Sequence, residues 1–351
     1  MTRLLKIEPG ADRDYIIDET ARILSQGGLC AFPTETVYGL AACRDITAAV
    51  ERMNAVKNRP GEKQYTLMLA DKHDVGRYVS KVPLIARKVI QRFWPGPLTI
   101  VFGDEGEHGL GVRVPASQTA RDIVRKTGKP TVVTSANLSG QPPATSAAQV
   151  LAALNSMIDV VVDEGETRLK EPSTVAVFRG GLWKVTREGL ISHDMIAKQA
   201  QVTVLFVCTG NSCRSPLAEV IFKRLLAEKL ECDEDDLDAL GYTVLSAGTE
   251  ATPGQAASEE ARITAGEFGC RLSEHTTRPV SEKLLGEADW IYTMTGAHLK
   301  SVQEMVPETA EKSSLLAEAD IADPMGGDAN DFKECALKIE NALKIVLEKL
   351  I

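Results

Sequence analysis

A cysteine, an arginine and a proline lie close together in the second half of the chain, spaced as in an anion-binding loop. The apolar run 202–207 predicts a buried strand that ends at Cys208. A short polar stretch follows, and a helix is expected from about Pro216 to Leu230, because proline is favoured where a helix begins. The N–H groups of such a loop and of the helix start converge on one point and bind phosphate groups. The same positive potential favours the thiolate form of Cys208.

Three side chains around this loop suit nucleophilic attack on phosphorus. Arg214 can donate two parallel hydrogen bonds to phosphoryl oxygens, which a lysine cannot do. Ser215 can donate a hydrogen bond to the thiolate and help the sulfur to leave in a second step. A leaving group also needs a proton donor, and Asp323 is the best candidate because Pro324 and two glycines place it in a shaped loop. The residues therefore predict phosphoryl transfer through Cys208.

Residues 202–351 resemble the low-molecular-weight protein tyrosine phosphatase family. The resemblance rests on the loop VCTGNSCRSP at 207–216, on SAGT at 246–249 and on the pair Asp323-Pro324. It implies a doubly wound parallel sheet, a cysteinyl-phosphate intermediate, no metal ion or other cofactor, and Asp323 acting first as acid and then as base. It also implies that phosphate is bound by the loop residues Thr209, Gly210, Asn211, Ser212 and Cys213.

The type of residue at position 212 bears on which phosphorylated side chain is the preferred substrate. Tyrosine-specific members of the family usually carry a bulky aliphatic residue there, and they place aromatic residues after the Asp-Pro pair and after the Ser-Ala-Gly segment. In this chain, segments 325–327 and 250–252 contain no aromatic residue. The loop more closely resembles that of the protein-arginine phosphatase branch, which has a small hydroxyl residue at the position of Ser212. We therefore expect hydrolysis of phosphoarginine in a phosphoprotein in preference to phosphotyrosine.

Two alternatives remain open for this half of the chain. It could be a tyrosine phosphatase, or an arsenate reductase that uses the same loop together with additional cysteines. The role of Cys213 is also open, because this residue could form a protective disulfide with Cys208 under oxidation or could simply pack.

Polar residues of the first half collect where predicted strands begin or end. Residues 1–198 contain no GxxxxGK[ST] phosphate loop and no GxGxxG motif. Cationic and hydroxyl side chains in loops beside rigid strands are typical of binding sites. Four cations could neutralise a triphosphate and a carboxylate, namely Lys57, Arg59, Arg113 and Arg187. The residues alone thus predict an α/β domain with an anion pocket.

Residues 8–195 are similar to the YrdC-like threonylcarbamoyl-AMP synthase family. The matching motifs occur in the family's order: FPTETVYGL (32–40), KNRP (57–60), WPGPLT (94–99), GVRVP (111–115), SANLSG (135–140), STV (173–175) and REG (187–189). The resemblance implies a twisted mixed α/β sheet around a large cationic cavity. It implies L-threonine, bicarbonate and ATP as substrates, with Mg²⁺ bound through ATP and not by protein side chains. The product would supply a tRNA threonylcarbamoyl transferase.

The resemblance also implies roles for individual residues. Threonine would be held by Thr34, Arg113 and Ser173. ATP would be contacted by Lys57, Arg59, Thr99, Ser135, Asn137, Thr145 and Arg187. The segment 61–70 lacks the histidine that the family often has there, and His73 is expected at the surface. The rival interpretation is a nucleotide- or RNA-binding module without synthase activity, and direct binding of tRNA stays open.

Length and charge predict two domains. The chain has 351 residues, 44% of them hydrophobic and 25% charged, which is typical of about two globular domains. Residues 1–198 hold 26 Lys and Arg against 22 Asp and Glu, whereas residues 199–351 hold 14 against 27. The second half is therefore a poor candidate for nucleic-acid binding. We predict a YrdC-like domain at 1–195, a linker at 196–201 and a phosphatase domain at 202–351.

Short apolar strands alternate with amphipathic helices in both halves, which favours α/β layers. In the first half, a helix is expected at 46–57 and strands are expected at 28–33, 65–70, 98–102, 131–134, 174–178 and 182–185. The polar segment 192–201 shows no strong periodicity and predicts an irregular connection.

The cysteine content and the lack of long apolar runs indicate the compartment. Seven cysteines, an odd number at irregular spacing, favour a reducing cytosol over a disulfide framework. No apolar run approaches the roughly 20 residues needed to cross a bilayer, and the N-terminal segment has no apolar signal core. We expect a cytoplasmic protein without a membrane partner.

Overall fold

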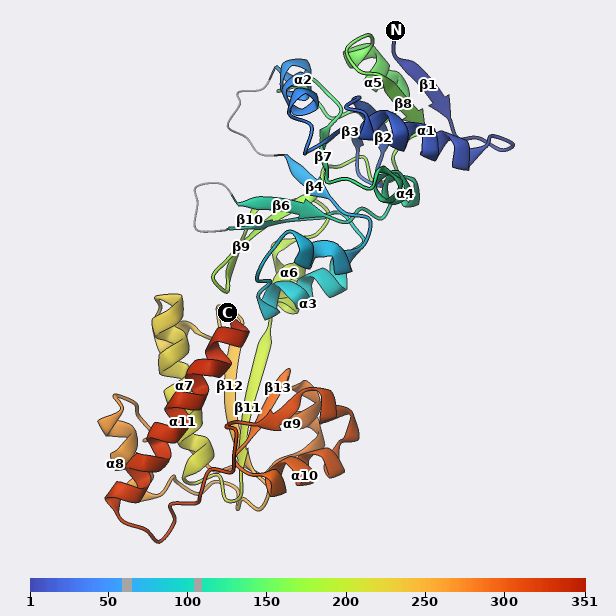
Figure 1. Cartoon of the computed structure of the whole chain (residues 1–351). Coiled ribbons are helices and arrows are strands. Elements are labelled where there is room, and N and C mark those ends of the chain that lie inside the picture. Colours follow the sequence, from blue (N-terminus) through green and yellow to red (C-terminus); the bar gives the residue numbers. More distant parts are fainter. Residues whose placement is uncertain (59–64, 104–108) are drawn as a thin grey trace. The chain divides into compact units, whose positions relative to one another are not determined.

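The computed structural model describes residues 1–58, 65–103 and 109–351. The chain divides into two compact units (Figure 1). The first unit contains residues 1–82 and 86–199, and the second contains residues 83–85 and 200–351. In the described ranges, no helix is both long enough and apolar enough to span a membrane.

A mixed sheet forms the frame of the first unit. Within the described residues it has ten strands, in the order β1-β8-β2-β3-β7-β4-β6-β5-β9-β10. Their bounds are Arg3–Lys6 (β1), Cys30–Pro33 (β2), Tyr38–Cys43 (β3), Thr66–Met68 (β4), Leu98–Phe102 (β5), Leu110–Arg113 (β6), Thr131–Ser135 (β7), Val160–Asp163 (β8), Thr174–Arg179 (β9) and Leu182–Arg187 (β10). β2 pairs antiparallel with β3, whereas β4 pairs parallel with β6. The predicted mixed α/β sheet is confirmed.

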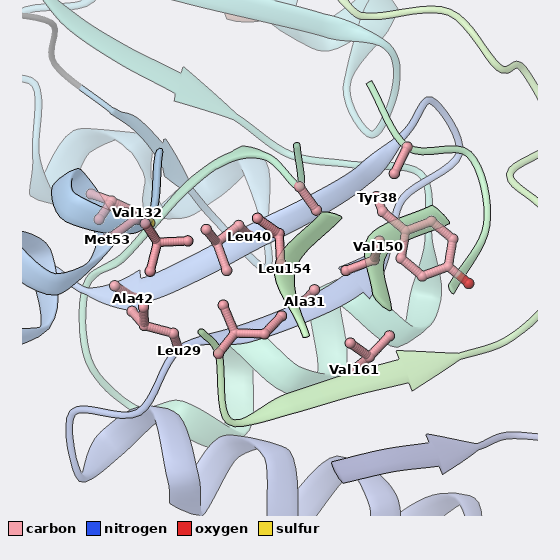
Figure 2. Packing of buried hydrophobic residues seen from close by; sticks show 14 of the residues in the cluster. Leu29, Ala31, Tyr38, Leu40, Ala42, Met53, Val132, Val150, Leu154 and Val161 are labelled. Carbon is pink, nitrogen blue, oxygen red and sulfur yellow. The ribbon is translucent and has the colours of Figure 1, made fainter. Parts of the chain in front are cut away.

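Helices cover both faces of this sheet. Their bounds are Arg13–Ser25 (α1), Thr47–Lys57 (α2), Leu84–Phe93 (α3), Gln118–Thr127 (α4), Ala147–Leu154 (α5) and His193–Gln199 (α6), with a 3₁₀ turn at Lys72–Arg77 (η1). Ala31 of β2 belongs to a buried cluster with Met53 of α2 and Leu154 of α5 (Figure 2). The next residue, Phe32, belongs to a second cluster with Ile123 of α4. Because successive side chains of a strand point to opposite faces, the sheet is buried on both sides.

Four parallel strands form the sheet of the second unit, in the order β12-β11-β13-β14. Their bounds are Val202–Cys208 (β11), Tyr242–Gly248 (β12), Trp290–Thr293 (β13) and Ser313–Leu315 (β14). The helices of this unit are Arg214–Leu230 (α7), Glu259–Glu267 (α8), Glu282–Glu287 (α9), Gly296–Met305 (α10) and Ala329–Leu350 (α11), with 3₁₀ turns at Glu234–Asp236 (η2) and Pro307–Glu311 (η3).

Adjacent residues of β11 pack against different helices. Leu205 belongs to a buried cluster with Leu285 of α9 and Val302 of α10. Phe206 makes an edge-to-face contact with Phe222 of α7, with 5.6 Å between the ring centroids. Figure 1 shows α7, α8 and α11 on one face of the strands and α9 and α10 on the other. The predicted doubly wound parallel sheet is confirmed.

Several predicted boundaries differ from the structure; for example, the strand predicted at 65–70 is only Thr66–Met68. Two of the differences have a clear physical reason. α7 begins at Arg214 rather than near Pro216, so the proline lies inside the first turn, where its missing N–H breaks no helical hydrogen bond. The segment predicted as an irregular connection contains α6, which buries Ile196. The sequence pattern hid α6 because only this one side chain of the helix is buried, so no apolar periodicity marks it.

Candidate functional site

Asn211 shapes the loop between β11 and α7. Its backbone lies in the left-handed region, with φ of +54°, which asparagine tolerates better than most residues. The buried side-chain amide donates hydrogen bonds to Ser215 Oγ (3.0 Å) and Ser246 Oγ (2.9 Å), and its Oδ1 accepts one from Arg278 N–H (2.9 Å). His275 Nε2 lies 2.8 Å from the Asn211 carbonyl oxygen. Contacts from separate segments of the chain therefore fix the loop conformation.

The thiol of Cys208 lies at the floor of this loop. The residue is only 2% exposed, and Asn211 N–H donates to Sγ over 3.3 Å. Ser215 Oγ lies 3.0 Å from Sγ. The Ser215 hydroxyl accepts a hydrogen bond from Asn211, so its own proton is not used in that bond. This proton can be donated to the sulfur or to the Ala247 carbonyl oxygen, 3.2 Å away. Both donors can stabilise a negative charge on the sulfur.

The chain at the end of β12 supports the loop from outside. Thr249 N–H donates to the Cys208 carbonyl oxygen over 2.9 Å. Glu250 N–H donates to the Thr209 carbonyl oxygen over the same distance. A Cβ atom on Gly248 would lie 2.3 Å from the Thr209 carbonyl oxygen, so only glycine allows this close approach. These two carbonyl groups are thereby bonded on the outside of the loop, and Asn211 N–H points to the sulfur.

Arg214 and Asp323 meet although 109 positions separate them in the sequence. Arg214 is only 4% exposed, and its Nη2 forms an ion pair with the Asp323 carboxylate. Its Nη1 donates to the Ile321 carbonyl oxygen (3.1 Å). The Asp323 side chain is 45% exposed and accepts a hydrogen bond from Met325 N–H (3.2 Å). The guanidinium is therefore buried beside the loop, and the carboxylate remains accessible to solvent.

Cys213 and Ser212 complete the loop and contact the residue before α8. Cys213 is buried, and its thiol donates to Ser258 Oγ (3.3 Å). Burial raises the pKa of the Cys213 thiol. Ser212 is half-buried, as are Thr209 and Gly210, and its carbonyl oxygen accepts a hydrogen bond from Ser258 N–H (2.9 Å). All seven cysteines are free thiols in this structure, Cys213 included.

His298 of α10 contacts the loop, and sequence reasoning missed it. Its ring is buried, with Nε2 2.9 Å from Thr209 Oγ1 and Nδ1 2.9 Å from Thr295 Oγ1. Burial and the nearby charge of Arg214 lower the pKa of His298. The sequence carries no signal for the contact with Thr209, because Thr295 followed by His298 resembles an ordinary helix start.

A cavity of about 310 Å³ lies against the sheet of the first unit. Its wall combines apolar side chains with hydroxyls and two guanidinium groups. Six residues predicted to bind threonine or ATP line it, namely Thr34, Thr99, Arg113, Ser135, Ser173 and Arg187. Tyr65 and Thr66 also line it and were not predicted. The fold thus brings together residues from motifs that lie far apart in the sequence.

Arg113 is held by Glu35, which sequence reasoning did not single out. Arg113 Nη2 lies 2.7 Å from Glu35 Oε1, and both side chains are buried. Thr36 Oγ1 accepts a hydrogen bond from the same Nη2 (2.9 Å). Glu35 Oε2 accepts hydrogen bonds from the N–H groups of Ala116 (2.9 Å) and Ser117 (3.2 Å). Burial opposes ionisation of Glu35, but the Arg113 charge and these hydrogen bonds hold the pKa of that carboxyl below its usual value.

Arg187 and Ser173 form the second polar cluster of the cavity. Arg187 Nη2 donates to Ser173 Oγ (3.2 Å), and its Nε donates to the Ser173 carbonyl oxygen (3.0 Å). Ser173 Oγ lies 2.9 Å from Thr99 Oγ1. Partial burial and the charge of Arg113 lower the pKa of Arg187. Among the described residues, no carboxylate forms an ion pair with Arg187, so its charge is available to an anion in the cavity.

Three described residues that were predicted to contact ATP do not line the cavity, namely Lys57, Asn137 and Thr145. The Lys57 ammonium is buried and donates to the carbonyl oxygens of Ser135 (2.7 Å) and Asn137 (2.5 Å) and to Asn137 Oδ1 (3.0 Å), so it holds the turn after β7. Thr145 Oγ1 donates to Gln149 Oε1 (3.1 Å). Arg59 lies outside the described residues. Thr34 lines the cavity, but its hydroxyl also donates to the Val37 carbonyl oxygen (2.7 Å) and closes a local turn.

The geometry defines an α/β protein with two candidate anion sites, one around a thiol and one in a cavity that two of the described arginines line. Comparison with family models matches most of each unit to a known family. Residues 22–189 match the Sua5/YciO/YrdC model, described as telomere recombination. Residues 203–351 match the model described as low molecular weight phosphotyrosine protein phosphatase. The chain therefore joins a Sua5/YrdC domain to a low-molecular-weight phosphatase domain, and this part of the predicted resemblance is confirmed.

Individual relatives match one half of the chain or the other. A threonylcarbamoyl-AMP synthase from Pyrococcus abyssi is 35% identical over 46% of this chain and 50% of its own length. A structure of P. abyssi Sua5 has a TM-score of 0.54, is 24% identical, and the match covers 71% of this chain and 91% of that one. A structure of the YwlE arginine phosphatase from Geobacillus stearothermophilus has a TM-score of 0.37 and is 29% identical, over 42% of this chain and 92% of that one. The chain spans about half the length of the curated relatives it matches.

Proposed function

We propose that the chain is a bifunctional enzyme whose two units act on different phosphorus compounds. The second unit hydrolyses a phosphoprotein through a cysteinyl-phosphate intermediate, with phosphoarginine preferred over phosphotyrosine. The first unit makes threonylcarbamoyl-AMP, which a tRNA threonylcarbamoyl transferase consumes. The observation that carries the proposal is the convergence of an N–H group, a hydroxyl and a buried guanidinium on the loop around one thiol.

The geometry of the Cys208 loop supports the following course for the proposed hydrolysis. A phosphoryl dianion enters the loop and takes the place of the Asp323 carboxylate on Arg214. The Cys208 sulfur attacks phosphorus, the bond from phosphorus to the leaving group breaks, and protonated Asp323 gives its proton to the departing atom. Water then attacks the cysteinyl phosphate while Asp323 takes a proton from it. The sulfur leaves as a thiolate that Ser215 stabilises with a hydrogen bond.

The preference for phosphoarginine rests on the entrance of the loop. Ser212 is small, polar and half-buried, and it offers no apolar surface to a phenyl ring. Asp320 and Glu250 are exposed, and their charges partly oppose the lowering of the His298 pKa that burial causes, so both lie near the loop. Their negative charges favour a guanidinium leaving group over a phenol.

A substrate panel tests this part of the proposal. Phosphoarginine and phosphotyrosine peptides of the same sequence are given to the full chain and to its Ser212→Ile variant. The natural chain is expected to hydrolyse the phosphoarginine peptide faster, and the variant is expected to shift toward phosphotyrosine. Faster turnover of phosphotyrosine by the natural chain, or no shift in the variant, contradicts the preference. Turnover of arsenate instead of either peptide would favour the reductase.

The first unit acts by positioning and charge neutralisation. The amino group of L-threonine forms a C–N bond to bicarbonate, and water leaves, which gives a carbamate. A carbamate oxygen then attacks the α-phosphorus of ATP, and pyrophosphate leaves with the electrons of the broken P–O bond. Thr34, Arg113 and Ser173 hold threonine in the proposal. The guanidinium of Arg187 neutralises charge on the phosphates, and ATP enters with its Mg²⁺. Support comes from the cavity, which these four residues line.

Pyrophosphate release tests this half. It is expected to require L-threonine, bicarbonate and ATP together, and to stop when any one is omitted. RNA binding with a strong salt dependence and no pyrophosphate release would instead show a binding module. Lys57, at the end of α2, and Asn137, in the turn after β7, keep their proposed role toward ATP only if Lys57→Ala and Asn137→Ala raise the KM for ATP in a folded protein.

A further inference from the structure

A hydrogen-bonded chain of four side chains leads from the start of α10 to the arginine of the cysteine site. Thr295 Oγ1 accepts a hydrogen bond from His298 N–H (3.3 Å) and contacts the ring at Nδ1 (2.9 Å). The other ring nitrogen contacts Thr209 Oγ1 (2.9 Å). Thr209 follows Cys208 directly, and its Oγ1 lies 3.4 Å from Arg214 Nη2. The buried histidine is therefore one residue away from both the nucleophile and the phosphate-binding guanidinium.

The protons of this chain can be assigned by counting donors and acceptors. Burial and the Arg214 charge lower the pKa of His298 and so favour the neutral ring, which carries one N–H. When the Thr295 hydroxyl donates to Nδ1, Nε2–H donates to Thr209 Oγ1. Arg214 Nη2 donates to the same oxygen, so both acceptor positions of the Thr209 hydroxyl are filled. The hydroxyl proton of Thr209 is then left to donate to a phosphoryl oxygen in the loop.

We propose that His298 is a positioning residue of the cysteine site, which fixes the Thr209 hydroxyl and through it the guanidinium of Arg214. The proposal rests on the proposed phosphatase function of this unit. His298 touches neither the sulfur nor the substrate. The buried His298 ring, rather than a water molecule, bonds to the Thr209 hydroxyl. This hydroxyl is therefore oriented before phosphate binds.

Protection of Cys208 from alkylation by iodoacetamide tests the proposal without any turnover. Inorganic phosphate is titrated against the alkylation rate in the full chain, which gives the affinity of the loop for phosphate. His298→Ala is expected to weaken that affinity about tenfold, the effect of one lost hydrogen bond in a charged network. Thr209→Val is expected to weaken it by a similar factor, and the double variant is expected to show no further loss. Lys300→Ala, an exposed change on the same helix, is the matched control and is expected to leave the affinity unchanged.

A conservative variant separates positioning from folding. His298→Gln keeps a side-chain donor and is expected to recover most of the phosphate affinity, with a melting temperature like that of the natural chain. Unchanged affinity in His298→Ala, or an additive loss in the double variant, overturns the proposal. If His298→Ala does not fold, the cycle is run with His298→Leu, which also removes the ring donor, and Thr209→Val, and additivity there also overturns it. Absence of hydrolysis of every peptide by the natural chain refutes the proposed function alone, since phosphate protection is measured independently.

Discussion

The two candidate sites differ in how the chain assembles them. Around Cys208, the nucleophile, the loop amides and the guanidinium come from one continuous stretch of the chain, and later segments lock that stretch in place. In the first unit, the polar residues of the cavity come from separate strands and loops between Thr34 and Arg187. A continuous site carries its geometry in local backbone conformation, whereas a dispersed site depends on the whole sheet. Substitutions in the continuous site should therefore mainly lower the rate of reaction. Substitutions in the dispersed site should lower both the rate of reaction and the stability of the fold.

The largest effect is expected for Cys208→Ser. Loss of the nucleophile should reduce hydrolysis by about 10⁴-fold or more, as for other nucleophile substitutions. Pyrophosphate release should not change, because the residues that line the cavity belong to the first unit and Cys208 belongs to the second. Both rates are measured on the same preparation, with Cys232→Ser as the control thiol. A parallel fall in pyrophosphate release would break the comparison, because the sites would not be independent.

The next effect is expected for Glu35→Gln in the dispersed site. Removing one partner of the buried pair leaves Arg113 uncompensated and should cost the first unit about 3–5 kcal/mol of unfolding free energy. Urea unfolding with hydrogen exchange of the β6 amides measures it. Glu166→Gln, at an exposed ion pair with Lys170, should change little. Equal effects of the two substitutions would contradict the buried role of Glu35.

The same variant predicts a pH dependence. The pKa of Glu35 is lowered from its ordinary value of 4.5, so its charge stabilises the folded state above that pH. This contribution should decline as the pH falls from about 4.5 through the folded pKa. The difference in stability between the natural chain and Glu35→Gln should therefore shrink in acid. A difference that stays constant between pH 7 and pH 3 would exclude the ionised pair as its source.

A smaller effect is expected for Gly248→Ala. The added Cβ would press on the Thr209 carbonyl oxygen and shift the loop, which should lower kcat/KM for hydrolysis about 10- to 100-fold. Gly266→Ala in α8 is the matched control, because nothing lies within 4 Å of its added Cβ. The control should leave hydrolysis unchanged and slightly raise the melting temperature. Equal activity of both variants would show that the loop tolerates displacement.

The smallest effect concerns two threonines predicted to contact ATP. Thr99 lines the cavity, and its Oγ1 contacts Ser173 Oγ, whereas Thr145 bonds to Gln149. Thr99→Val should raise the KM for ATP by about five- to tenfold, the effect of one hydrogen bond. Thr145→Val should change the KM for ATP by less than about twofold, because loss of the Thr145 hydroxyl would not alter the wall of the cavity. Equal increases would show that Thr145 reaches the nucleotide.

The continuous site was largely predictable and its supports were not. The strand, the polar loop and the helix around Cys208 are adjacent in sequence, so their order alone predicts a converging loop. Asn211 could be assigned to the loop, but its bonds to Ser246 and Arg278 could not, because they depend on tertiary packing. His298 shows the same limit, since its partner Thr209 lies 89 positions away.

The individual residues of the dispersed site were predictable only through family motifs. Composition and periodicity predicted strands and an anion pocket, and the layered mixed sheet agrees with them. The motifs did not distinguish residues that line the cavity from residues that hold its walls. Lys57 is the clearest case, because a cation at the end of a helix gives no sign that its ammonium will be buried among carbonyl oxygens. Burial of that kind depends on where the turn after β7 is placed by the sheet.

The ion pair between Arg214 and Asp323 has a consequence for the resting protein. A carboxylate tethered to the same fold competes for the guanidinium at an effective concentration that free chloride or acetate does not reach. We therefore expect small monoanions to be poor inhibitors of this unit. A ligand displaces Asp323 only if its bonds to the loop are stronger than the ion pair that it breaks. This requires two negative charges and enough oxygens to bond to the backbone amides as well as to Arg214. Asp323 would therefore also exclude other anions from the site when no substrate is bound.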